Sequence, residues 1–326
     1  MKTEILQLLR ASDSYVSGQE ICQRLEVSRT AIWKVINQLK EEGYVIEAVS
    51  KKGYRLQECP DLVTKSEIHS QLDTKWLGRE MTCVSEVGST NQELKKLAEE
   101  GACHGSTYVA NVQMAGRGRR GREWDSKTGN HITMSLLLRP TFEPSIASML
   151  TLVMAVSVAK AIEEVTKLSC MIKWPNDILI EGRKVAGILT EMSAEQGYIH
   201  YVVIGVGVNV NEEELPPQIA EIATSIQQQR GVEQNRSRLI VRILHYFEQE
   251  YERFCQQGDL GHIMEWYEKH LRNIGSVVRV ESPSGVYEAK AVGMNEQGEL
   301  LVEREGGRIE AIYAGEVSIR GINGYV

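Results

Sequence analysis

The spacing of apolar positions divides the chain into three regions. Residues 1–60 show helical spacing followed by two short alternating segments. Residues 61–273 mix helical and strand patterns, and residues 274–326 show strand patterns alone. The patterns therefore predict a multidomain α/β protein with domain limits near residues 60 and 273.

The first region predicts a winged helix-turn-helix. Its helices are expected over residues 2–11, 18–25 and 29–43. Ser17 and Ser28 precede the second and third helices as N-caps, and Glu20 completes a capping box with Ser17. The core-facing stripe of the third helix consists of Ala31, Ile32, Val35, Ile36 and Leu39. Alternating segments over residues 44–50 and 53–58 then predict a β-hairpin, the wing.

The outer face of the third helix is polar and basic. Residues 24–40 carry four positive charges against one negative, and two lysines occupy the hairpin tip. In this motif the third helix meets base edges, and basic side chains contact the DNA backbone. We therefore expect DNA contacts from Ser28, Arg29, Thr30, Trp33, Lys34, Asn37, Lys51 and Lys52. A small interaction module with a solvated charged face is the alternative.

The central region predicts a mixed sheet with helices. Strand patterns occur over residues 82–86, 107–112, 131–138, 171–174, 178–180, 185–192 and 199–210. Helical patterns occur over residues 91–100, 144–168, 236–256 and 261–271. Because hairpins occur beside helical crossovers, a mixed sheet is favoured over a purely parallel one.

The last region predicts a small β-barrel. Five short alternating segments, separated by glycine turns, cover residues 275–282, 286–295, 299–305, 308–314 and 316–321. No helical pattern interrupts them.

Composition excludes several classes of protein. The 326 residues are 42% hydrophobic and 25% charged, with 28 glycines and 7 prolines, which excludes a disordered or collagenous chain. The net charge is −7, so any nucleic-acid contact has to come from a local patch.

The sequence predicts a cytoplasmic protein that does not enter a membrane. The N-terminus carries Glu4 and lacks the apolar core of a signal peptide. The most apolar stretch, residues 146–159, is shorter than the roughly 20 residues that span a bilayer, so we expect a buried helix there. The six cysteines show no CxxC spacing and are expected to be reduced thiols.

The most informative motif is GRGRRGR at residues 116–122, followed by Glu123 and Trp124. Its glycines fit G-x-G-x-x-G, but no helical pattern follows, and the GK[ST] of a P-loop is missing, so both of those nucleotide motifs are rejected. Four arginines and three glycines in seven residues predict a flexible cationic loop that wraps a polyanion such as a nucleotide triphosphate. The alternatives are a solvated basic loop and a second nucleic-acid patch.

A second motif is KWPND at residues 173–177. Lys173 ends an apolar strand and is braced by Trp174 and Pro175, so its ammonium is held in a definite direction. Such a compact charge suits a developing carboxylate or phosphoryl charge. A solvated lysine at a strand end is the alternative.

Two further motifs are polar or glycine-rich. GSTN at residues 88–91 lies between a strand and a helix, where its side chains can hold polar ligand groups or merely cap the helix. GVGVN at residues 205–209 lets a flat ligand approach the backbone, or marks a bend. The sequence holds no Ser/His/Asp set, no HExxH and no paired carboxylates with clear roles, and its seven histidines show no ligand spacing.

Together these motifs resemble the biotin protein ligases, of the bifunctional type that is also the biotin operon repressor. The resemblance is carried by SGQEICQRLEVSRTAIWKVINQLKEEGY, GSTNQEL, QMAGRGRRGREW, KWPNDIL, RKVAGIL and GVGVN, in this order, and spans residues 2–320. It implies a winged helix domain at residues 1–60, a catalytic domain like that of class II aminoacyl-tRNA synthetases at 61–273, and an SH3-like barrel at 274–326.

The resemblance also implies a reaction. Biotin and MgATP form biotinyl-5′-AMP, and biotin then passes to a lysine of the biotin carboxyl carrier domain of a carboxylase. The carboxylate of biotin is itself the nucleophile, so the site has to align the substrates and neutralise charge. Operator DNA is expected to bind a ligand-dependent homodimer, with the adenylate as co-repressor and the carrier domain competing with the second protomer.

The family's site residues map onto this chain. By resemblance, biotin contacts Ser89, Thr90, Asn91, Gln113, Arg117, Gly118, Arg119, Lys173, Gly187 and Gly205. The nucleotide contacts Arg119, Arg120, Arg122, Trp124, Lys173 and Asn209. Lys173 and Arg119 are the expected catalytic groups, whereas the Mg²⁺ ligands are unknown. Glu123 departs from the family's pattern, where a basic residue is equally expected.

Two other classes of function fit part of the sequence. A lipoyl or octanoyl ligase shares the catalytic fold, but the winged helix, KWPND and the C-terminal strands argue against it. A transcription factor that only senses a small ligand is the other alternative. Assays with biotin, lipoate, ATP and a carrier domain separate the three.

Overall fold

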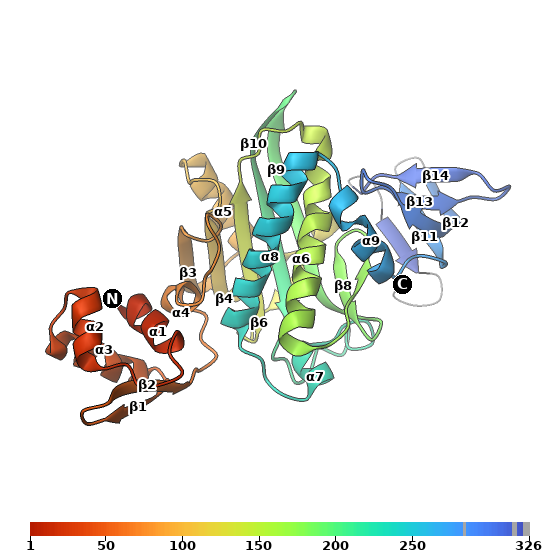
Figure 1. Ribbon diagram of the computed structural model, residues 1–326. Helices are drawn as coiled ribbons and strands as arrows, with labels where there is room; N and C mark the ends of the chain where they lie inside the picture. The colour runs from red at the N-terminus through yellow and green to blue at the C-terminus, as the bar shows by residue number, and fades with distance from the viewer. Residues whose placement is uncertain (283–284, 315–317, 322–326) are drawn as a thin grey trace. The chain divides into compact units, whose positions relative to one another are not determined.

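The computed structural model describes residues 1–282 and 285–314 and the backbone of residues 318–321. It divides into two compact units (Figure 1). The first comprises Met1–Asp73 with Asn235–Val241, and the second comprises Thr74–Gln234 with Arg242–Val326.

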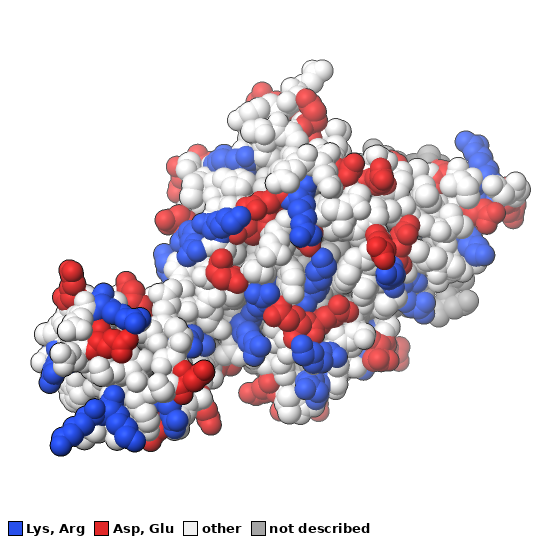
Figure 2. All heavy atoms as spheres, viewed as in Figure 1, with Lys and Arg blue, Asp and Glu red and all other residues white. Residues whose placement is uncertain are grey.

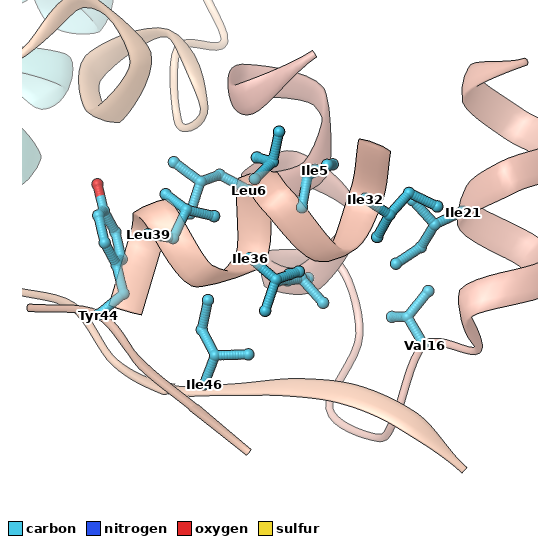
Figure 3. Packing of buried hydrophobic residues seen from close by; sticks show 11 residues of the cluster. Ile5, Leu6, Val16, Ile21, Ile32, Ile36, Leu39, Tyr44 and Ile46 are labelled. Carbon is cyan, nitrogen blue, oxygen red and sulfur yellow. The ribbon is translucent and has the colours of Figure 1, made fainter. Parts of the chain in front are cut away.

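In the first unit, helices and a hairpin surround one core. The elements are α1 (Lys2–Arg10), α2 (Gly18–Leu25), α3 (Arg29–Glu41), β1 (Val45–Val49), β2 (Gly53–Glu58) and α4 (Lys65–His69). Figure 3 shows Ile5 and Leu6 of α1 packed beside Ile36 of α3. The predicted winged helix-turn-helix is confirmed, and α4 is an element that the sequence analysis missed.

The core stripe of α3 is confirmed except at its first position. Ile32, Val35, Ile36 and Leu39 are buried, whereas Ala31 is half-buried. Burying such side chains stabilises the fold by roughly 1.5–3 kcal/mol each, so the stripe holds α3 against the rest of the unit.

The predicted helix caps form in part. The Oγ of Ser17 accepts a hydrogen bond from the Glu20 N–H at 3.1 Å, and the Oγ of Ser28 accepts from the Ala31 N–H at 3.2 Å. The Glu20 carboxylate pairs with Arg24 at 2.9 Å. The prediction of a full capping box was therefore wrong, because the carboxylate is taken by a cation one helical turn along the same face.

The second unit contains a mixed sheet with strand order β3-β4-β6-β10-β9-β8-β7, and β5 pairs with β4. The strands are β3 (Met81–Val87), β4 (Thr107–Arg117), β5 (Glu123–Ser126), β6 (His131–Leu138), β7 (Met171–Lys173), β8 (Asp177–Ile180), β9 (Arg183–Glu195) and β10 (Tyr198–Asn209). β3 and β4 are parallel, because α5 (Thr90–Glu99) crosses between them, and the other pairs are antiparallel. The predicted mixed sheet is confirmed.

Helices pack against this sheet. α5 contacts β4, β6 and β10, whereas α6 (Leu150–Thr166) contacts β7, β8 and β9. α8 (Arg236–Gln257) runs beside α6 in Figure 1, and Lys160 of α6 pairs with Glu250 of α8 at 2.7 Å. α7 (Ile226–Arg230) and α9 (Gly261–His270) are shorter.

α6 is a buried core helix, as predicted. By length and composition the stretch Pro144–Thr166 could cross a membrane, but 78% of its most apolar window is buried inside the protein. Two of its hydroxyl groups are satisfied within the helix, because Ser157 donates to the carbonyl of Val153 and Thr166 donates to that of Ile162. All six cysteines are free thiols.

The C-terminal segments form an antiparallel sheet of order β14-β13-β12-β11-β15. Its strands are β11 (Val277–Ser282), β12 (Gly285–Met294), β13 (Leu300–Glu303), β14 (Ile309–Ile312) and β15 (Ser318–Gly321). Each of the five predicted segments contains one strand, although residues 316–317 of the last segment lie outside the described residues.

Candidate active site

The register of the large sheet brings distant motifs into one row. Successive paired residues along this row, from β6 to β7, are Thr133, Gly207, Gly187, Asp177 and Lys173. Directly paired residues point to the same face of a sheet. Strand pairing alone therefore brings the GVGVN, RKVAGIL and KWPND segments together.

A cavity opens over this row and is lined by almost every residue predicted to bind biotin or the nucleotide. All ten residues expected to bind biotin line it: Ser89, Thr90, Asn91, Gln113, Arg117, Gly118, Arg119, Lys173, Gly187 and Gly205. The nucleotide-site predictions Arg119, Arg120, Arg122, Trp124 and Lys173 also line it.

Asn209 is the exception. It is buried, it is not among the residues that line the cavity, and its amide donates to the carbonyl of Thr224 at 3.0 Å. Its contact with the nucleotide stays a prediction.

Lys173 is the buried cation of the cavity. Its side chain is 6% exposed, so the alternative of a solvated lysine is wrong. Burial lowers the pKa of Lys173 to about 8, against the opposing effect of the Asp177 carboxylate. The strand end is fixed because the backbone N–H of Trp174 donates to Asn273 at 2.8 Å and its indole N–H donates to the Gly298 carbonyl at 3.0 Å.

Trp124 lies flat on the glycine row. A Cβ atom at Gly207 would lie 2.4 Å from the Cε2 atom of Trp124, so only glycine leaves room for the indole. Lys184 places its Nζ atom 5.5 Å from the centre of the indole ring and 2.6 Å from the Oδ1 atom of Asp177. The expected close approach of a flat group to GVGVN is thus made by a side chain of the protein, and β10 continues without a bend.

The arginine-rich segment forms a tight turn between paired strands. β4 extends to Arg117, β5 begins at Glu123, and the N–H of Gly118 donates to the carbonyl of Arg122 at 2.7 Å. β5 was not predicted, because four residues are too few to show a clear alternation of apolar and polar positions. The turn brings Arg117, Arg120 and Arg122 to the surface as exposed side chains.

Arg119 differs from these three arginines. Its guanidinium donates to the Oδ1 of Asn176 at 3.3 Å and to the carbonyl of Ala314 at 2.7 Å. Burial lowers the pKa of Arg119, and the Asp177 carboxylate counteracts this effect. Arg119 therefore ties the turn to the KWPND segment and to the C-terminal strands.

The polar end of the cavity lies at the start of α5. The N–H and the hydroxyl of Thr90 are 2.9 and 3.1 Å from the Oε1 atom of Gln113, which accepts from them. Ser89 is the N-cap residue, but its side chain makes no cap hydrogen bond. The hydroxyl of Ser89 is therefore available to a ligand, and the interpretation of Ser89 as a mere cap is not supported.

Several site residues were missed because they lie in ordinary strand patterns. Leu189 and Glu191 of β9 line the cavity, and Ser135 of β6 contacts Thr90 and Asn91. The only signal in the sequence was a carboxylate within a largely apolar strand. Among the described residues, no group of three or more His, Cys, Asp or Glu side chains could hold a metal ion.

The predicted DNA contacts lie on the surface of the first unit. All eight are exposed or half-buried, and the indole of Trp33 is 57% exposed. Arg29, Lys51 and Lys52 line a groove beside the wing. Figure 2 shows Lys and Arg atoms over the β1–β2 hairpin. The hydroxyl of Ser28 already accepts the cap hydrogen bond, which leaves its proton and its second lone pair for a contact with DNA.

Comparisons with known proteins agree with this arrangement. The model of the biotin/lipoate A/B protein ligase family matches residues 84–209, a helix-turn-helix domain model matches residues 2–55, and a biotin protein ligase C-terminal domain model matches residues 274–320. Among solved structures, the biotin protein ligase of Aquifex aeolicus in complex with biotin and ATP is 30% identical with a TM-score of 0.67. The match covers 74% of this chain and 99% of that one.

Whole-length relatives carry all three parts. The bifunctional ligase/repressor BirA of Bacillus subtilis is 39% identical over 322 residues, which is 98% of both chains. BirA of Escherichia coli is 31% identical over 312 residues, covering 96% of this chain and 95% of the relative. Since the likeness runs from the winged helix through the cavity to the last strands, this chain belongs to the family of bifunctional biotin protein ligase/repressors.

Proposed function

We propose that the protein is a biotin–[acetyl-CoA-carboxylase] ligase and a DNA-binding repressor of biotin genes. The observation that carries the ligase is the cavity itself. It joins a polar end, formed by Thr90 and Gln113, to a cationic end, formed by Lys173 and Arg119, beside the flat indole of Trp124. A ligand with a polar ring, a carboxylate tail and an attached nucleotide matches these three parts.

The first step is formation of a mixed anhydride. A carboxylate oxygen of biotin attacks the α-phosphorus of ATP, the bond between that phosphorus and the bridging oxygen breaks, and pyrophosphate leaves. Negative charge accumulates on the phosphoryl oxygens. Lys173 and Arg119 supply fixed positive charge there, and such preorganised charge is worth more in a site that excludes water.

The second step transfers biotin. The amine of a lysine on the biotin carboxyl carrier domain attacks the carbonyl carbon of the anhydride, the bond from carbon to the phosphate oxygen breaks, and AMP leaves with the excess proton released. Neither step needs a protein nucleophile. Alignment of the two reactants is therefore the main contribution of the site.

Mg²⁺ is expected to accompany ATP, and it would neutralise phosphate charge. Mg²⁺ is commonly held through one or two carboxylates together with substrate phosphates. In the lining of the cavity, the Asp177 carboxylate already pairs with Lys184. The residues therefore do not form a ready protein cage, and no step above depends on the metal.

One experiment tests the ligase. The full chain is incubated with biotin, ATP and a carrier domain, and the mass of the carrier domain is measured. We expect one biotinyl group on one lysine, and no modification when lipoate replaces biotin. Modification by lipoate would favour the lipoyl ligase alternative. Specific operator binding without any carrier modification would leave a ligand-sensing repressor.

The repressor function is supported by the first unit. It holds one winged helix-turn-helix with exposed basic residues on α3 and the wing, and one such module reads only a few base pairs. Two protomers on two half-sites roughly double the contact free energy. Tight repression therefore requires a homodimer.

We infer that the adenylate is the co-repressor. Three exposed arginines lie on one turn, and their charges oppose the approach of a second protomer. A bound adenylate neutralises and orders that turn, so it favours dimerisation. Sedimentation and operator titrations without ligand, with biotin, and with biotin plus ATP test this. Equal dimerisation in all three conditions would contradict it.

Other features of the family are expected here as well. We propose that the central domain is of the class II synthetase type, that the C-terminal strands close into an SH3-like barrel, and that the domain limits are 60 and 273. We also propose a cytoplasmic location, and competition between the carrier domain and the second protomer for one surface.

A further inference from the structure

A chain of hydrogen bonds connects a partly exposed ion pair to the polar end of the cavity. The Nζ of Lys95 lies 2.7 Å from the Oε1 of Glu191, and the Oε2 of Glu191 accepts from the Nδ2 of Asn91 at 2.7 Å. On its other side, the Oδ1 of Asn91 accepts from the hydroxyl of Ser135 at 2.5 Å. Asn91 and Ser135 are buried, whereas the Glu191 side chain is 33% exposed.

The carboxylate of Glu191 determines which group donates and which accepts along these hydrogen bonds. An amide side chain can present either its oxygen or its nitrogen to a neighbour, but an ionised carboxylate only accepts. Glu191 at 2.7 Å, together with the more distant carbonyl of Leu189 at 3.4 Å, therefore holds the nitrogen of Asn91 and turns the oxygen of Asn91 toward Ser135. The single hydroxyl proton of Ser135 then points toward the oxygens of Asn91 and of Thr90, which lies 2.8 Å away. Thr90 accepts on this side, because its own hydroxyl proton goes to the Oε1 of Gln113.

This series of hydrogen bonds ends at the cavity. Gln113 uses its Oε1 to accept from the N–H of Thr90 at 2.9 Å, so its Nε2 points away from Thr90. Within the described ranges, no group accepts a hydrogen bond from this Nε2, and Gln113 lines the cavity. The polar end thus presents an amide donor beside hydroxyl oxygens that accept. A cyclic urea, with one carbonyl and two N–H groups, needs this combination.

We propose that Glu191, held by Lys95, is a positioning residue that sets which groups donate and which accept at the end of the cavity that takes the biotin ring. This inference rests on the proposed ligase function. Glu191 acts through Asn91 and lies away from the cationic end at Lys173. It should therefore control the binding of biotin and leave the rate of adenylation, once biotin is bound, nearly unchanged.

Glu191→Gln tests the role of the carboxylate. A glutamine can offer its nitrogen to Asn91 and so favour the reversed amide, which leaves only the longer bond to the Leu189 carbonyl at 3.4 Å to hold the original direction. We expect the KM and the Kd for biotin to rise about tenfold, the scale of one hydrogen bond to an ionised group. The kcat at saturating biotin and the KM for ATP should stay within about twofold, because neither depends on this end of the cavity.

Glu93→Gln is the matched control. Glu93 lies on α5, pairs with Lys96 at 2.7 Å and is also 33% exposed, but it has no bond to Asn91. Both variants lose one carboxylate from an ion pair with a lysine of the same helix. Glu93→Gln should leave the Kd for biotin within about twofold, while Glu191→Asp, which keeps an acceptor, should recover part of the loss.

A double variant supplies an independent test. Asn91→Asp places two carboxylates in contact and should weaken biotin binding more than Glu191→Gln does. Combining Asn91→Asp with Glu191→Gln places an amide donor at position 191 against a carboxylate acceptor at position 91. The other carboxylate oxygen at position 91 still accepts from Ser135. We expect the double variant to bind biotin at least about fivefold more tightly than Asn91→Asp alone, the coupling of two groups in direct contact.

Three results would overturn the inference: an unchanged Kd for biotin in Glu191→Gln, an equal loss in Glu93→Gln, or no recovery in the double variant. A fall in kcat with unchanged biotin affinity would also overturn it. A wild-type protein that does not biotinylate a carrier domain would instead overturn the proposed function on which the inference rests.

Discussion

The two cationic parts of the cavity are built in opposite ways. Lys173 ends a buried strand, is 6% exposed, and is followed by Trp174, whose two N–H groups are both bonded. Arg120 and Arg122 lie on a turn and are exposed. The backbone of Arg120 is in the left-handed region, with a φ of 57°. One cation is held in place before any ligand arrives, whereas the arginines of the turn have room to rearrange.

This difference assigns the two parts separate tasks. A buried, fixed charge stabilises a transition state because no reorganisation is needed at the moment of reaction. Exposed arginines on a turn raise the local concentration of a polyanion, and we propose that this is the task of Arg117, Arg120 and Arg122. Arg119 joins the two parts, since its guanidinium reaches Asn176 beside the fixed strand.

Lys173→Ala should have the largest effect on chemistry. Removing one preorganised donor lowers the rate by roughly 10²–10³, so we expect pyrophosphate release at saturating biotin and ATP to fall by about that factor. Lys127→Ala is the control, because Lys127 is an exposed lysine outside the cavity lining. A near wild-type rate for Lys173→Ala would remove the fixed cation from the reaction.

Arg119→Gly should affect retention of the adenylate more than its formation. The substitution removes the bonds to Asn176 and Ala314 and one positive charge, so we expect the adenylate to dissociate about 10- to 100-fold faster. Released adenylate should then label lysines of bystander proteins. Arg120→Gly, in the same turn, should lose less, because Arg120 is exposed. Equal dissociation rates in wild type and Arg119→Gly would sink this prediction.

The pH profile reports on Lys173 directly. Because its pKa is about 8, Lys173 is protonated and positively charged below pH 8, and it loses this charge as the pH rises through that value. The kcat/KM for biotin should therefore fall above pH 8 by about tenfold per pH unit, and Lys173→Arg should move the fall to higher pH. A profile that is flat to pH 10, or one that is unchanged in Lys173→Arg, would contradict the assignment.

Removing the winged helix should change ligase activity least. A chain beginning at Asp61 keeps the cavity, and it keeps the bonds from Arg236 to Asp61 at 2.6 Å and from Ser237 to Leu62 at 2.5 Å. We expect ligase activity within about threefold of wild type and no operator binding, since the fold of the cavity is unaltered. A folded chain without ligase activity would show that the two parts depend on one another.

A chain beginning at Thr74 sharpens the previous result. It lacks Asp61 and Leu62 and therefore loses the hydrogen bonds that Arg236 and Ser237 donate to them at the start of α8. Its free energy of unfolding should be lower by roughly 1.5–3 kcal/mol than that of the chain beginning at Asp61. Equal stabilities by denaturant unfolding would mean that residues 61–73 contribute nothing to the fold of the truncated protein.

Motifs with unusual composition could be read from the sequence, and ordinary strand residues could not. GRGRRGR, KWPND and GSTN stand out by their residue types, and all three line the cavity. Glu191 and Ser135 occur in strands of normal composition, and their roles depend on strand register, which a single sequence does not fix. The partner of GVGVN could not be foreseen either, because the indole that covers Gly207 comes from β5, an unpredicted strand.

The biotinyl-5′-AMP intermediate distinguishes the proposed two-step reaction from any direct transfer of biotin. The full chain is mixed with biotin and ATP without a carrier domain, separated from small molecules, and examined by native mass spectrometry. We expect one bound biotinyl-5′-AMP per protomer, which disappears as biotinylated carrier domain and AMP appear on addition of the carrier. Carrier biotinylation with no adenylate at any time, or an adenylate that persists in the presence of carrier, would contradict this expectation.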